Sequence, residues 1–308
     1  MDVQIGKHVG ALGRALRHGR WKAFRWALAA AAGIGLPFAA HAAGAVPEVT
    51  VEAQREVLEH EAMTFVQGLT RNTGYWDDSL IRWNSPICFY TAGFPDEQAQ
   101  PLIARLSQIA TTAGAGLAAQ PCEPNFVVIA TDDPRRVIDE WRKKDMHIFG
   151  EGPPKTVRRF VKRAGSRPID LWHNVSPTAP RGIPYVANMT FPGQATNTHA
   201  EDSRLAWGAG LSMVSVFAIV DTRRTEHISL EAIADYVALT GLTKLDPNTD
   251  PGTAPTILRL FGPSSDGTGT AGLSEWDAAF LKALYHTEQG SRLQRWQMMT
   301  RILHDVAP

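Results

Sequence analysis

Two groups of side chains have the types and spacing that catalytic chemistry requires. Glu231 and Asp235 stand four residues apart, so a helix would carry both carboxylates on one face, where acidic groups can transfer protons. The same acids also suit the first half of a helix, where the helix dipole favours negative charge. The second group joins imidazoles to carboxylates, the ligand types of a metal site, although its spacing matches no established motif: His173, His199, Glu201 and Asp202.

The second group lies in a region with little hydrophobic periodicity. Residues 177–208 are rich in Pro, Gly, Thr and Asn, and a loop of that length in a compact domain is often functional. Residues 173–202 are therefore a candidate hydrolase site. The sequence lacks the G-x-S-x-G, P-loop and G-x-G-x-x-G signatures, and no two histidines of residues 43–308 have a metal-type spacing. We predict neither a cofactor nor a bound metal.

The acidic pair belongs to the most regular segment of the chain. Residues 214–220 form a near-continuous apolar run, which is typical of an interior strand, and a polar turn follows at 221–227. Ser229 is a candidate N-cap for a helix that carries apolar residues on one face as far as Leu242.

Other strands and helices alternate along the chain. Apolar and β-branched runs predict strands at 87–90, 126–130 and 169–173. Periodic apolar residues predict helices at 51–69, 96–114, 133–141, 156–164, 274–285 and 291–306. The strand–helix–strand order suggests that the first two strands are parallel neighbours. We predict an α/β or α+β domain with a single sheet, flanking helices and an irregular region at about 145–212.

Residues 1–42 have the composition of a secretory signal peptide. Six Lys and Arg residues and one Asp precede an uncharged apolar run at 26–40, and Ala40-His41-Ala42 is an A-x-A cleavage site. The run is shorter than the ~20 apolar residues of a membrane span, and an anchor is the alternative. Cleavage near Ala42 would leave a periplasmic or secreted domain, residues 43–308, with no further membrane span.

That domain would carry 25 basic and 30 acidic residues, a net charge of −5, which argues against sequence-independent nucleic-acid binding. One local basic run stands out: Arg158, Arg159, Lys162, Arg163 and Arg167. This run is either a site for an anionic partner or a solvated helix face.

Cys88 and Cys122 are the two cysteines of the chain. In an oxidising compartment they would form a disulfide that closes a loop of about 35 residues and stabilises the fold by ~3 kcal/mol. Two buried thiols are the alternative.

Three segments near the end of the chain carry a resemblance: ADYVALTGL at 234–242, PTIL at 255–258, and a helix from LSEWD at 273–277 to LY at 284–285. Their order resembles matrixin-like zinc metallopeptidases, in which an H-E-x-x-H-x-x-G-L helix is followed by a short apolar turn and a further helix. The chain is also similar to a group of exported bacterial proteins without an established activity. That similarity lies in W-x-x-x-x-C at 83–88, C-x-P-N at 122–125 and the segment at 234–242.

The metallopeptidase resemblance implies a zincin-like C-terminal half without zinc. Ala234 and Ala238 stand at the positions of the two histidine ligands, Asp235 at that of the general base and Lys244 at that of the distal ligand. The helix is then either a zincin scaffold without its metal or an ordinary core helix. We predict a non-catalytic pseudoenzyme that binds a peptide or protein of the cell envelope in a cleft between the sheet and residues 230–242.

Overall fold

The computed structural model describes residues 48–70, 80–144, 146–150, 154–178, 210–245, 250–262, 272–289 and 293–307. These residues belong to one unit that spans Pro47–Pro308. The predicted signal peptide lies outside the described residues. No helix within the described ranges has the length and hydropathy needed to cross a membrane.

A five-stranded sheet is built around β5 (Gly210–Asp221), which contains the predicted interior strand. β3 (Phe126–Thr131) pairs in parallel with its C-terminal half, and β2 (Phe89–Ala92) lies parallel to β3 on the outside. The short β1 (Arg82–Trp83) pairs in parallel with the N-terminal half of β5, and β4 (Ile169–Thr178) runs antiparallel along its other edge. The predicted α/β class with a single sheet is confirmed, as are the parallel neighbours β2 and β3.

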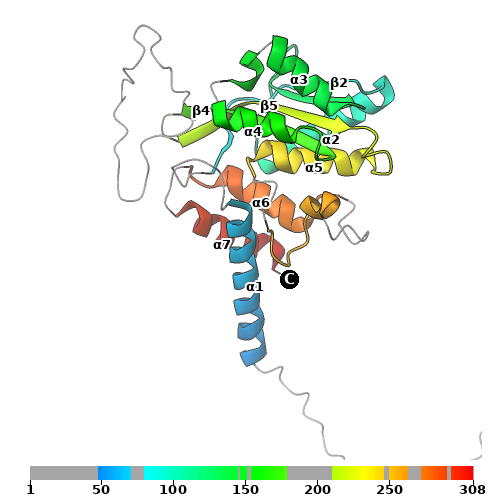
Figure 1. The fold of residues 1–308 in the computed structure, drawn as a ribbon. Helices are drawn as coiled ribbons and strands as arrows, with labels where there is room; N and C mark the ends of the chain where they lie inside the picture. Colours follow the sequence, from blue (N-terminus) through cyan, green and yellow to red (C-terminus); the bar gives the residue numbers. More distant parts are fainter. Residues whose placement is uncertain are drawn as a thin grey trace, which may run out of the picture. The chain divides into compact units, whose positions relative to one another are not determined.

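Helices cover both faces of this sheet (Figure 1). α2 (Asp96–Ala113) and α5 (Leu230–Leu242) pack side by side on one face. The other face carries α3 (Pro134–Lys144), the short helix η1 (Met146–Phe149) and α4 (Pro154–Arg163). Coverage on both sides explains why β5 is apolar along most of its length.

A further layer of helices packs beyond α2 and α5. It contains α6 (Glu275–His286), the short helix η3 (Ile257–Phe261) and α7 (Gln294–Val306), which packs against α6. The first helix, α1 (Glu48–Thr70), packs against α7 with its C-terminal part, and its other end projects past α6 and α7 (Figure 1).

The sheet separates two hydrophobic cores. Side chains of β5 alternate between them: Val216 and Ala218 face the main core with α2 and α5, whereas Phe217 and Ile219 face α3 and α4. The smaller core on the α3–α4 side is largely aromatic. It contains Trp141, Phe149, Phe160, Trp172 and Phe217.

Side-chain caps fix the starts of two helices, and the first of them, Ser229, is the cap that the sequence predicts. The Ser229 hydroxyl accepts a hydrogen bond from the Ala232 N–H and begins α5. Ser274 and Asp277 form a capping box at the start of α6. Buried Asp277 also accepts hydrogen bonds from the Thr256 hydroxyl at 2.6 Å and the Ile257 N–H at 2.8 Å, which ties η3 to α6.

The predicted disulfide between Cys88 and Cys122 is confirmed, with a Cα–Cα distance of 6.0 Å. Asn125 holds the same region together, because its side chain accepts from the Cys88 N–H and donates to the Pro86 carbonyl. The bridge therefore fastens the segment before β3 to the segment before β2.

The predicted irregular region is more ordered than its composition indicates. The predicted basic helix is α4, and the predicted strand 169–173 continues to Thr178 as β4. A bulge between Asn174 and Val175 lets the polar end of β4 keep pairing with β5. Pairing with the apolar β5 supplies the order that the sequence of β4 does not predict by itself.

Candidate functional site

The helix of the acidic pair, α5, is sealed in the core. Every residue from Ala232 to Leu242 is buried, and Ala234 and Ala238 have no exposed surface. A helix buried on all sides borders no opening. The predicted cleft between the sheet and this helix is therefore wrong, because the sheet packs directly against it.

Contacts at the C-terminal end of α5 show how close this packing is. The Trp83 indole N–H donates to the Gly241 carbonyl at 3.0 Å. A Cβ atom on Gly241 would lie 2.2 Å from the ring of Phe126, which has no exposed surface. Glycine at this position is required by the close approach of β3 and not by its backbone angles.

Both carboxylate oxygens of Asp235 are used in structural bonds. Arg105 on α2 makes a bidentate contact, with Nε 2.6 Å from one oxygen and a terminal nitrogen 2.9 Å from the other. The Leu273 N–H donates to the second oxygen at 2.6 Å. The hydrogen bond that Arg105 donates to Asp235 also raises the pKa of Arg105. Asp235 therefore links α5, α2 and the segment before α6.

Glu231 lies at the rim of this arrangement. Its side chain is 67% exposed, and its carboxylate is 3.6 Å from the Arg105 guanidinium. Asp235 has no exposed surface, so the two acids do not face a shared space in which a substrate could bind. The two acids lie on one helix as the sequence predicts, but both carboxylates contact the Arg105 guanidinium.

His173 on β4 faces α5. Its Nε2 lies 2.8 Å from the Thr240 carbonyl oxygen. Burial lowers the pKa of His173 to about 4, and Lys244 and Arg163 add to the shift. Its predicted companions His199, Glu201 and Asp202 lie outside the described residues, so the second group is represented in the structure by His173 alone.

The low pKa of His173 predicts a specific pH dependence of stability. Between pH 6.5 and pH 4 the unfolded chain binds a proton at this residue that the folded chain does not, so stability falls as the pH is lowered. Between about pH 6.5 and about pH 4.5 the wild type should lose about 2 kcal/mol more than His173→Gln, which cannot take up the proton. Urea unfolding of both proteins at the two pH values measures the difference. Equal losses would contradict this assignment.

Lys244, at the position of the distal zinc ligand in the resemblance, lines a small cavity. The cavity holds about 10 Å³, roughly one water molecule, and its other lining residues are mostly apolar. It is too small for a substrate. Among the described residues, no three His, Cys, Asp or Glu side chains come together in a way that could hold a metal ion.

A second candidate site lies on the opposite side of the sheet, where α3 and α4 meet. A Cβ atom on Gly165 would lie 3.8 Å from the Cβ of Arg135, so the start of α3 lies beside the end of α4. Exposed Lys and Arg side chains follow both helices, and six of them have no ion-pair partner among the described residues. We call these six the basic face: Arg136, Lys143, Lys155, Arg158, Arg159 and Lys162.

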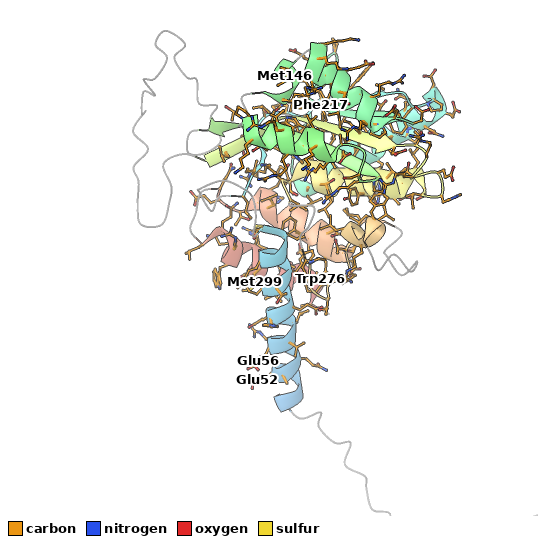
Figure 2. The ribbon with its side chains drawn as sticks, viewed as in Figure 1. Glu52, Glu56, Met146, Phe217, Trp276 and Met299 are labelled. Atoms are coloured by element: carbon orange, nitrogen blue, oxygen red, sulfur yellow. A yellow bond between two sulfur atoms is a disulfide. The ribbon has the colours of Figure 1, made fainter. Side chains whose placement is uncertain are left out.

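The basic face is a local exception in an acidic chain. Residues 134–167 contain eleven Lys and Arg and four Asp and Glu, a net charge of +7, whereas the rest of residues 43–308 carries fourteen bases and twenty-six acids, a net charge of −12. The sequence indicates the α4 part of this surface through its basic run. The sequence does not indicate that the bases of α3 lie beside those of α4. The two helices are brought together by the aromatic core that both cover, which includes Phe217 (labelled in Figure 2).

No protein-family model, no curated protein and no solved structure matches the chain.

Proposed function

We propose that the protein is exported and acts as a non-catalytic domain, which binds an acidic peptide or protein segment of the cell envelope through its basic face. The signal-like residues 1–42 and the disulfide, a bond that persists in oxidising compartments, support export. On the metallopeptidase resemblance, the C-terminal half is a zincin-like pseudoenzyme that has lost its metal.

The burial of α5 supports a non-catalytic role. A general base must reach its substrate within hydrogen-bond distance, and Asp235 has no exposed surface. Its oxygens are already bonded to Arg105 and to the Leu273 N–H. A group with these partners stabilises the fold and has no free position for a reacting atom.

The uneven distribution of charge along the chain is the observation that supports binding at the basic face. Six exposed cations have no ion-pair partner within the described ranges, and the rest of the chain is strongly acidic. Together they create a local positive potential that steers acidic segments to this surface. Each exposed ion pair contributes about 0.2–1 kcal/mol, so six contacts together supply a few kcal/mol. Such binding is expected to weaken as salt screens the charges.

Fluorescence anisotropy with a labelled poly-glutamate peptide tests this function. At low salt the protein should bind this acidic peptide. Arg158→Glu/Arg159→Glu should weaken this binding by at least about tenfold, which corresponds to ~0.7 kcal/mol for each reversed charge.

The matched control is Lys282→Glu/Arg301→Glu, which makes the same change in net charge on the exposed surfaces of α6 and α7. This variant should bind like the wild type. An equal loss in both variants would show that only net charge matters. Absence of binding to poly-glutamate at low salt would reject the proposed function.

A further inference from the structure

We propose that the acidic segment bound by the basic face is helix α1 of a second copy of this chain. The inference rests on the proposed function, because it names the partner of the same surface. Its starting point is the composition of α1, which contains five Glu residues and one Arg, a net charge of −4 in a single helix: Glu48, Glu52, Glu56, Glu59, Glu61 and Arg55.

Among the residues that the structure describes, the C-terminal part of α1 is the part that packs against the rest of its own chain. Phe65 is buried against Trp276 and Phe280, with ring centroids 5.5 Å and 5.9 Å apart, and Leu69 is buried with it. Residues 52–57 are exposed, and Val57 has 67% of its surface exposed. α1 therefore presents both acidic and apolar groups that the described part of its own chain leaves uncovered.

Contact with a partner would stabilise the exposed end of α1 as a helix. A helix of about 12 residues is marginal in water by itself, because the cost of nucleation is recovered only over a longer length or through packing. Its first residues are held by their connection to the packed part and by the ion pair between Arg55 and Glu59. A surface that paired with the remaining glutamates would stabilise this end.

The basic face is opposite to α1 in charge and also offers it an apolar contact. Six bases face the exposed glutamates of α1, Glu52 and Glu56, and Met146, which is 50% exposed in η1 between α3 and α4, offers an apolar contact for a residue such as Val57. Figure 2 shows Glu52 and Glu56 far from Met146, on the other side of the sheet and the α2–α5 layer. α1 therefore cannot reach the basic face of its own chain, and the contact joins two copies.

This contact uses a different surface on each copy. A pair of chains joined in this way still has one free α1 and one free basic face, so assembly continues to a closed ring or an open filament. Because the contact is largely between exposed charges, assembly is expected at low salt and is reversed by added salt.

Reciprocal charge reversal tests the inference on protein purified from cells that express the full chain. Sedimentation velocity at low salt should show oligomers of the wild type. Glu52→Lys/Glu56→Lys brings the net charge of α1 from −4 to 0, and Arg158→Glu/Arg159→Glu brings that of the basic face from +6 to +2. Each variant should be monomeric, because the attraction between the two surfaces is then largely lost. An equimolar mixture of the two variants should form heterodimers, since the unaltered basic face of the first variant meets the unaltered α1 of the second. The same mixture controls for folding, because two misfolded variants would not recover assembly.

The outcomes separate this inference from the proposed function. A wild type that is monomeric at low salt but binds poly-glutamate through Arg158 and Arg159 overturns the inference and leaves the proposed function intact. A monomeric wild type that instead sediments with phosphatidylglycerol vesicles overturns it in favour of a membrane surface. Two monomeric variants that fail to assemble when mixed also overturn it.

Discussion

Arg105→Met is expected to lower the free energy of unfolding by about 3–5 kcal/mol. The Asp235 carboxylate has no exposed surface, and without Arg105 its remaining donor is the Leu273 N–H. Removal of one partner of a buried ion pair costs this much because it leaves the other charge buried and uncompensated. Arg105 itself is 30% exposed, so Met can occupy its path along α2 without a steric penalty. Urea unfolding followed by circular dichroism measures the loss.

Glu231→Gln is the matched control for this prediction, because Glu231 contacts the same guanidinium from an exposed position. Its effect should stay within about 0.5 kcal/mol. The double variant Arg105→Met/Asp235→Leu removes both charges and should recover part of the stability, less the cost of the unpaired Leu273 N–H. A loss of under about 1 kcal/mol in Arg105→Met would show that solvent reaches Asp235.

Ala234→His/Ala238→His restores the histidine spacing of the resembled metal-binding helix, yet it is expected to destabilise the fold severely and to bind no zinc. Both alanine methyl groups have no exposed surface and pack in the main core. Overpacking costs about 1–3 kcal/mol per site, and a buried imidazole without a partner adds to that cost. We expect a loss of at least about 4 kcal/mol in total.

Thermal unfolding and elemental analysis for zinc measure the two parts of this prediction. Glu231→His is the control, because it places an imidazole on the exposed side of the same helix and should leave stability within about 1 kcal/mol. A folded double variant that holds one zinc ion per chain would mean that positions 234 and 238 face an accessible site. That result would favour a scaffold that lost its metal over an ordinary core helix.

The parts of the fold that follow from local pattern can be predicted from the sequence. β5 is apolar from Val216 to Val220 because helices cover both faces of the sheet, and such a run predicts an interior strand. Ser229 and the Ser274–Asp277 box mark the starts of α5 and α6 through bonds to nearby N–H groups. The Cys88–Cys122 bridge follows from the presence of only two cysteines in a chain with a signal-like N-terminus.

The parts that depend on distant segments could not be predicted with the same certainty. The partner of Asp235 lies 130 residues away, and nothing near Asp235 indicates it. The sequence does contain one indication of this ion pair. Arg105 lies between Leu102 and Ile109 on the buried side of α2, where an arginine needs an anionic partner. The apolar composition of residues 232–242 likewise indicates a helix buried on all sides rather than one beside a cleft.

The aromatic cluster beneath α3 and α4 has a consequence for how the molecule opens. Because the sheet divides this small core from the main one, α3 and α4 form a separable layer, which can detach while α2, α5 and the sheet remain folded. Amide hydrogens in this layer should exchange faster than those of β5. An acidic segment bound to the outer surface of α3 and α4 would slow amide exchange in these two helices. Native-state hydrogen exchange would therefore detect binding as an increase in the number of protected amides there.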